Sequence, residues 1–72
     1  MDGFRTSFGE RLAMLRENRM MERKDVCRLA GVSPTAYAYY ERGMSEPTAN
    51  VIVRLCRAFD VSADVLLGLE EA

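Results

Sequence analysis

The chain has 72 residues, of which 49% are hydrophobic and 29% charged, and its formal net charge at pH 7 is -1. This length suits one domain with a single small core and leaves no room for an enzyme cleft, while the apolar share is too high for a disordered chain. Since its apolar runs fall far short of the about 20 residues that a membrane helix needs, we expect a soluble, cytoplasmic protein that is not an enzyme.

The first predicted helix covers residues 7–19. Ser7 followed by Glu10 three residues later is a capping-box pattern, which marks a helix start. Phe8, Leu12 and Leu15 recur at steps of four and three, so they share one face of this helix. The end of the helix, in the loop of residues 19–21, carries no glycine and is less clearly marked.

Two short helices follow with a very short connection. The first is expected over residues 23–30, ends at Gly31 and turns Val26, Cys27 and Ala30 inward, with Met21 packing from just before it. The next is expected over residues 34–42, between Ser33 as N-cap and Gly43 at its end, and would bury Tyr37 and Tyr40. Two helices separated by so few residues form a helix-turn-helix, whose second helix can enter the DNA major groove.

Two further helices complete an all-α chain of five helices. Thr48 caps a helix that runs to about Phe59, and Ser62 caps a last short helix with Leu66 and Leu67 as its apolar residues. The core residues expected from the longer of the two are Ile52, Leu55, Cys56 and Phe59. We therefore predict a single domain over residues 1–72, with a core of about 7–68 and short flexible ends.

A series of motifs around the central helix pair resembles the Cro/phage-repressor type of helix-turn-helix, the XRE family. These motifs are Phe8-Gly9-Glu10-Arg11-Leu12, Glu41-Arg42-Gly43, Pro47-Thr48 and Ala58-Phe59-Asp60-Val61-Ser62. The resemblance implies a compact five-helix repressor-like DNA-binding domain. It also implies a transcriptional regulator that binds double-stranded DNA as a homodimer on a two-fold operator.

The same resemblance places the base contacts on the outward face of the third helix, at Pro34, Thr35, Ala38 and Tyr39. None of these is the Arg, Asn or Gln that ordinarily pairs with base edges, and apolar groups here suit thymine methyl groups. We therefore expect few direct base contacts, with specificity supplied by DNA shape or by arginines at the periphery. Of the three tyrosines, Tyr39 is the one expected to act on DNA.

Phosphate contacts are expected at Arg23, Ser33 and Arg42. Arg23 stands where the family commonly has a glutamine that binds phosphate, and its alternative is a solvated surface arginine. Ser33 is a helix cap whose hydroxyl or neighbouring N–H groups can also face phosphate. Arg42 can contact the DNA backbone or remain solvated.

Arg16 and Glu41 are expected to form a structural ion pair, because the family joins an arginine late in the first helix to the glutamate that ends the third. Such a pair would hold the third helix against the rest of the domain. Met44, Val51 and Val65 stand where relatives tend to be polar, which indicates either a protein contact surface, such as a homodimer interface, or scattered surface residues.

The charge is unevenly distributed: residues 5–42 carry eight basic and five acidic side chains, and residues 46–72 carry two basic and five acidic ones. The positive charge thus lies with the helix-turn-helix half, which predicts modest, salt-sensitive DNA binding. Cys27 and Cys56 lie in helical patterns, and the chain has no histidine, so we expect no metal site, disulfide or cofactor, and no small-molecule ligand is evident.

The sequence therefore favours a DNA-binding transcriptional regulator. Two alternatives stay open. One is a helix-turn-helix module that acts mainly through protein–protein contacts, as an antitoxin or regulator partner. The other is the DNA-binding part of a longer repressor.

Overall fold

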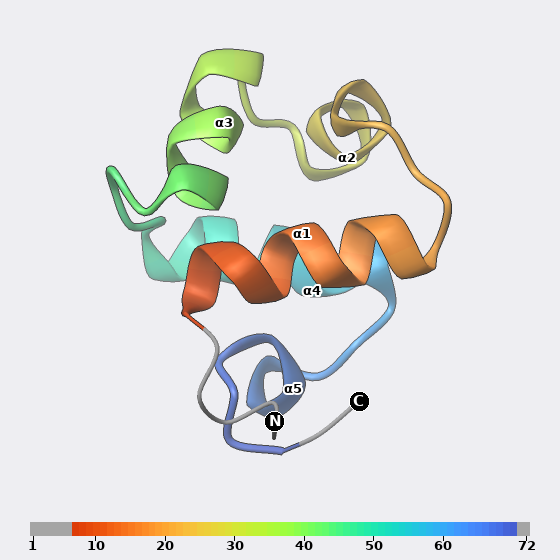
Figure 1. Cartoon of the computed structure of the whole chain (residues 1–72), viewed down its shortest axis with the longest axis vertical. Helices are drawn as coiled ribbons and strands as arrows, with labels where there is room; N and C mark the ends of the chain where they lie inside the picture. Colours follow the sequence, from red (N-terminus) through yellow and green to blue (C-terminus); the bar gives the residue numbers. More distant parts are fainter. Residues whose placement is uncertain (1–6, 71–72) are drawn as a thin grey trace.

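The computed structural model describes residues 7–70 and contains five helices in that range (Figure 1). They are α1 (Phe8–Asn18), α2 (Arg23–Ala30), α3 (Pro34–Arg42), α4 (Ala49–Phe59) and α5 (Ala63–Leu66). In Figure 1, α2 and α3 lie at one end of the molecule, α1 crosses the middle in front of α4, and α5 lies at the opposite end. The predicted all-α class and the five-helix order are confirmed.

Serine and threonine caps explain most of the helix starts. The hydroxyls of Ser7, Ser33, Thr48 and Ser62 each accept a hydrogen bond from a backbone N–H three residues later. Ser7 and Glu10 form the complete capping box that the sequence predicted. Because these bonds are local, the predicted helix starts agree with the structure.

Left-handed backbone conformations at the C-cap end three of the helices, α2 at Gly31, α3 at Gly43 and α4 at Asp60. Gly31 and Gly43 close α2 and α3 with φ of 67° and 75°, values that glycine adopts without a steric penalty. In the loop after α1, Met20 has a left-handed backbone with φ of 55°, a conformation that is uncommon for residues other than glycine. The side chain of Met20 is almost fully exposed.

The core lies between all five helices and is built from their apolar faces. Val26, Cys27 and Ala30 of α2 are buried as predicted, and Met21 packs against them from the preceding loop. Tyr37 is fully buried, whereas Tyr40 is only partly buried at the edge of the core. The α2–α3 pair is therefore anchored through one face of each helix, which leaves the other faces at the surface.

The buried face of α4 differs slightly from the predicted one, which was Ile52, Leu55, Cys56 and Phe59. Val51, Leu55 and Phe59 recur every four residues and form the buried stripe, while Ile52 and Cys56 flank it and are partly exposed. The hypothesis that Val51 and Val65 belong to an exposed protein contact surface was therefore wrong. Val51 is in the core and Val65 is half-buried against it.

Candidate nucleic-acid interface

The outward face of α3 carries the residues predicted to contact bases. Pro34 and Thr35 in the first turn are exposed, Tyr39 is 40% exposed and Ala38 is half-buried. Tyr37 lies on the opposite face in the core, so one helix separates an anchoring side from a surface side. The structure thus brings these four residues to one accessible surface.

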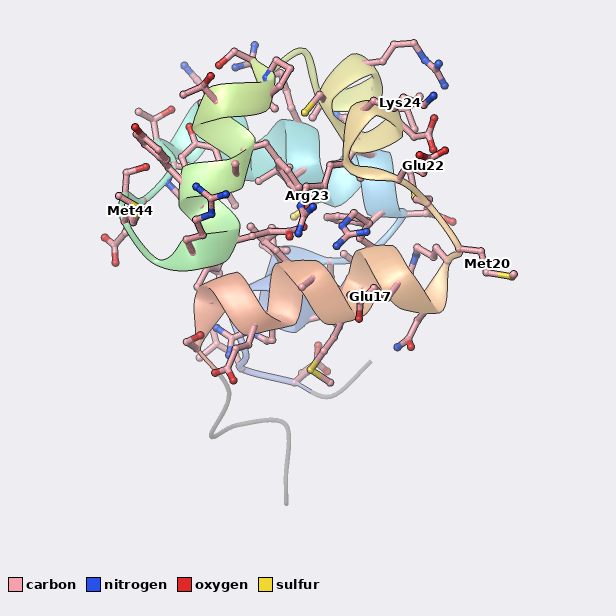
Figure 2. The ribbon with its side chains drawn as sticks, turned by 45° about the horizontal axis from the view of Figure 1, so that its top comes forward. Glu17, Met20, Glu22, Arg23, Lys24 and Met44 are labelled. Carbon is pink, nitrogen blue, oxygen red and sulfur yellow. The ribbon has the colours of Figure 1, made fainter. Side chains whose placement is uncertain are left out.

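The residues predicted to contact phosphate surround this face. Ser33 is exposed and caps α3, with its Oγ accepting from the Ala36 N–H at 3.1 Å. Arg42 is exposed in the last turn of α3. Arg23 begins α2 and lies in the centre of the face seen in Figure 2, between α2 and α3. Its side chain is 63% exposed.

Arg16 and Glu41 are paired in the structure. Arg16 Nε donates to Glu41 Oε2 at 2.8 Å, and Arg16 Nη2 donates to Glu41 Oε1 at 3.4 Å. Arg16 Nη1 also donates to the carbonyl oxygen of Met21 at 3.1 Å, in the loop before α2. One buried arginine on α1 therefore binds both α3 and the loop that leads into α2.

A second arginine joins this pair, which the sequence did not indicate. Arg23 Nε donates to Glu41 Oε1 at 3.1 Å, so the carboxylate of Glu41 accepts from two guanidinium groups. Burial by itself raises the pKa of Glu41, but the hydrogen bonds that the carboxylate accepts, led by those from Arg16, outweigh it and lower the pKa. Glu41 is therefore a charged acceptor at the junction of α1, α2 and α3.

Two of the arginines in the basic half act inside the domain. Arg11 Nε donates to the carbonyl oxygen of Leu66 at 3.0 Å, and Arg19 Nε donates to that of Phe59 at 2.8 Å. Both bonds satisfy carbonyls near helix C-termini, where a positive charge is favourable. Arg16 is bound to Glu41 as well, so three guanidinium groups make hydrogen bonds inside the domain. Among the described residues of the basic half, Arg23, Lys24, Arg28 and Arg42 are exposed and can face a polyanion.

Metal-binding groups and membrane-spanning helices were sought in the described part of the chain. Within residues 7–70 no group of three or more Cys, Asp or Glu side chains is arranged to hold a metal ion, and Cys27 and Cys56 are free thiols. None of the helices in that range is long and apolar enough to cross a membrane.

Comparison with known proteins gives a family match over most of the chain. The family model described as a helix-turn-helix domain matches residues 7–68. Two Bacillus subtilis (strain 168) proteins are similar over 62 residues, or 86% of this chain: the uncharacterized HTH-type transcriptional regulator YobD at 31% identity and the HTH-type transcriptional regulator AnsR at 32%. The match covers 55% of YobD and 53% of AnsR, so the chain spans about half the length of these relatives.

A solved structure has a similar arrangement of helices over most of the chain. The P22 c2 repressor protein, in complex with synthetic operator 9T, superposes with a TM-score of 0.81 at 29% identity, over 86% of this chain and 94% of the repressor chain. Its helices and those of this chain thus have the same fold. By its sequence match and its architecture, the chain belongs to the helix-turn-helix domain family, with the fold of a phage-repressor domain.

Proposed function

We propose that the chain is a sequence-specific DNA-binding transcriptional regulator that inserts α3 into the major groove. The observation that carries this proposal is the division of α3 between the buried Tyr37 and the accessible Thr35 and Tyr39. A helix held this way can lie in a groove without unfolding any part of the domain. The relatives named as transcriptional regulators and the operator-bound P22 c2 repressor support the proposal. It includes action in the cytoplasm, without enzymatic activity.

In the proposed complex, Pro34, Thr35, Ala38 and Tyr39 meet base edges. Arg23, Ser33 and Arg42 contact phosphates on either side of the groove. Thr35 supplies a hydroxyl and a methyl group and Tyr39 a hydroxyl and a ring edge, whereas the other two supply apolar contact only. Direct readout of donors and acceptors is therefore sparse. Much of the discrimination would come from thymine methyl groups and from DNA shape.

The proposal also includes a homodimer on a two-fold operator, with the two copies of α3 in major grooves about 34 Å apart. We place the contact with the second copy at a hollow in the described surface. It is lined by Phe8, Arg11, Glu46, Pro47, Ile52 and Leu67. Leu67 is 44% exposed there, so Leu67→Glu tests the interface without opening the core. Sedimentation should show a dimer for the native chain and a monomer for this variant.

An alternative function as a protein-binding module would use exposed apolar residues. Met20 and Met44 are both strongly exposed, at 93% and 64%. Figure 2 shows them at opposite sides of the face that carries α2 and α3, so they do not form one docking patch. Met20 and Met44 by themselves therefore do not supply one docking site for a partner protein on this face.

The experiment that tests the proposal is a mobility-shift titration of the chain with duplexes from its own upstream region at low ionic strength. The double variant Thr35→Ala with Tyr39→Ala changes the outward face only, so it should fold normally and lose the specific shift. The matched control is Arg54→Ala, which removes an exposed side chain from α4. Absence of any complex with the native chain would reject DNA binding and leave the protein-binding alternative.

A further inference from the structure

Arg42 lies on the same face of α3 as the residues proposed to contact bases. Four residues of this helix recur at the spacing i, i+3, i+4 and i+7: Thr35, Ala38, Tyr39 and Arg42. That spacing places side chains on one face of an α-helix. Arg42 is exposed, whereas Tyr37 on the opposite face is buried in the core. Arg42 therefore extends the outward face of α3 into its last turn.

The guanidinium group of Arg42 has no partner within residues 7–70, in contrast to the arginines that hold the domain together. Arg16 donates to Glu41, and Arg19 donates to a backbone carbonyl at the end of α4. No described residue makes a hydrogen bond or an ion pair with Arg42. Its five N–H donors, arranged in a rigid planar fork, are therefore available to a ligand that carries a pair of acceptors.

The carbonyl oxygens at the end of α3 are satisfied without Arg42. The backbone N–H of Gly43 donates to the carbonyl of Tyr40 at 3.2 Å, and that of Met44 donates to the carbonyl of Tyr39 at 2.9 Å. With Gly43 in the left-handed conformation, these two bonds form a Schellman motif. Because the backbone itself closes the helix, removal of the Arg42 side chain should leave the fold intact.

A guanidinium supplies the pair of donors that the rest of the outward face lacks. Arginine bonded to O6 and N7 of guanine is the commonest specific contact in the major groove. Pro34 and Ala38 offer apolar contact only, and Thr35 and Tyr39 offer one hydroxyl each. The third helix of a homeodomain contacts bases with residues at the same spacing of i, i+3, i+4 and i+7. A residue at the place of Arg42 can therefore reach a base when the helix lies in the groove.

We propose that Arg42 is a specificity-determining residue that binds a guanine base in the major groove. This inference rests on the proposed function, because it concerns the same DNA surface, and it extends the role of Arg42 from the phosphate backbone to a base edge. Two N–H groups of Arg42 donate to O6 and N7 of one guanine. Thr35 and Arg42 are separated by about 10 Å along the helix axis. The guanine thus lies about three base pairs from the pair that Thr35 contacts.

A base contact and a phosphate contact differ in their effect on sequence preference. Loss of a phosphate contact weakens binding to every duplex by a similar factor and reduces the salt slope by about 1. Loss of a guanine contact removes the preference at one position of the site and leaves the other positions as they were. The two roles of Arg42 can therefore be separated by the position dependence of binding.

The experiment begins with a duplex selected from random sequences by the native chain. Each guanine is replaced in turn by 7-deazaguanine, which lacks the N7 acceptor and keeps its pairing with cytosine. We expect one guanine in the recognised site at which the substitution weakens the native chain about tenfold, and at which it weakens Arg42→Ala less than about twofold. The control Lys24→Ala removes an exposed cation that Figure 2 shows on the side of α2 away from α3, so it should keep the tenfold sensitivity.

The outcomes separate this inference from the proposed function. If the native chain and Arg42→Ala respond alike to 7-deazaguanine at every position, Arg42 is at most a phosphate contact and the inference is overturned. Thermal unfolding checks the fold of Arg42→Ala, and we expect a small change because no described residue bonds to this side chain. A native chain that enriches no sequence at all would reject the proposed function itself, and the guanine contact with it.

Discussion

The Nε atom of Arg16 in α1 lies 2.8 Å from the Oε2 atom of Glu41, which is the penultimate residue of α3. Both side chains are largely shielded from water, with exposed fractions of 11% and 6%. The pair spans 25 residues of sequence and holds the proposed reading helix against the helix that crosses the domain. The stability of the fold and the presentation of α3 therefore depend on the same contact.

Arg16→Ala should lower the free energy of unfolding by about 3 kcal/mol, the scale found when one partner of a buried pair is removed. The bond from Arg23 keeps Glu41 from being entirely unpaired, so the loss should lie near the lower end of that scale. Chemical denaturation measures it. The control is Arg28→Ala, because Arg28 is exposed and only 3.7 Å from Asp25, and it should change stability by less than about 0.5 kcal/mol. Equal effects of the two variants would contradict the structural role of the pair.

Gly9→Ala should destabilise the domain, although alanine is the better helix former. A Cβ on Gly9 would lie 2.7 Å from the carbonyl oxygen of Tyr40 and closer still to that of Glu41. These are backbone atoms of the last turn of α3, so α1 and α3 would have to separate. We expect a loss of about 1–3 kcal/mol from this overpacking, against a gain of about 1 kcal/mol from helix propensity alone. A lower melting temperature would show that overpacking dominates, and a higher one would show that helix propensity does.

Tyr37→Phe should leave stability unchanged or increase it. The Tyr37 hydroxyl is buried and has no hydrogen-bond partner within residues 7–70. Burial raises the pKa of this phenol, and the nearby Glu41 carboxylate adds to the rise, so it stays protonated. Removing an unsatisfied hydroxyl relieves a desolvation cost of about 1–3 kcal/mol, part of which the phenyl ring should recover. A clear drop in melting temperature would instead show that the hydroxyl donates to Glu41.

Acid should weaken the fold through Glu41. Because the pKa of Glu41 is lowered in the folded state, its contribution is fully present above its usual value of 4.5 and is lost as the pH falls through the lowered folded value. The Glu41→Gln variant should be less stable than the native chain at pH 7, and this difference should shrink below pH 4.5. Glu46→Gln, at an exposed site, serves as the control. A difference that stays constant with pH would contradict the assignment.

Thymine methyl groups should carry part of the sequence preference. Replacing thymine by uracil in a selected duplex removes only the 5-methyl group, which Pro34, Thr35 and Ala38 are proposed to contact. We expect a severalfold loss of affinity at those positions and none at thymines outside them, because a methyl contact is a modest apolar interaction. Fluorescence anisotropy compares a duplex that carries uracil at the contacted positions with one that carries uracil only outside them. Equal affinities would leave DNA shape as the source of specificity.

The helix bounds could be predicted because the signals that set them are local. Ser33, Pro34 and Gly43 define α3 through a cap, a fixed φ and a left-handed turn, all within one short segment. The burial of Val26 and Tyr37 followed from helical spacing in the same way. Val51 was not predicted as a core residue, because relatives tend to be polar at this position. Its spacing of four residues from Leu55 is the signal that indicates the buried face.

Long side chains that bridge distant elements could not be predicted from residue spacing. Arg11 reaches Leu66 across 55 residues, and Arg19 reaches Phe59 across 40. Nothing in the local pattern distinguishes these arginines from solvated ones. The Arg16–Glu41 pair could be anticipated only through the family resemblance. The resemblance did not predict the bond from Arg23 to Glu41, because the family commonly has a glutamine at the position of Arg23.

The measurement that tests the central claim most directly is selection of duplexes from a random pool by the native chain and by the Thr35→Ala, Tyr39→Ala variant. If the outward side of α3 reads the groove, the native chain should enrich a two-fold site, and the variant should bind at low salt yet enrich a different sequence or none. Enrichment of the same site by both proteins would contradict the claim, because the sequence would then be read by some other part of the domain.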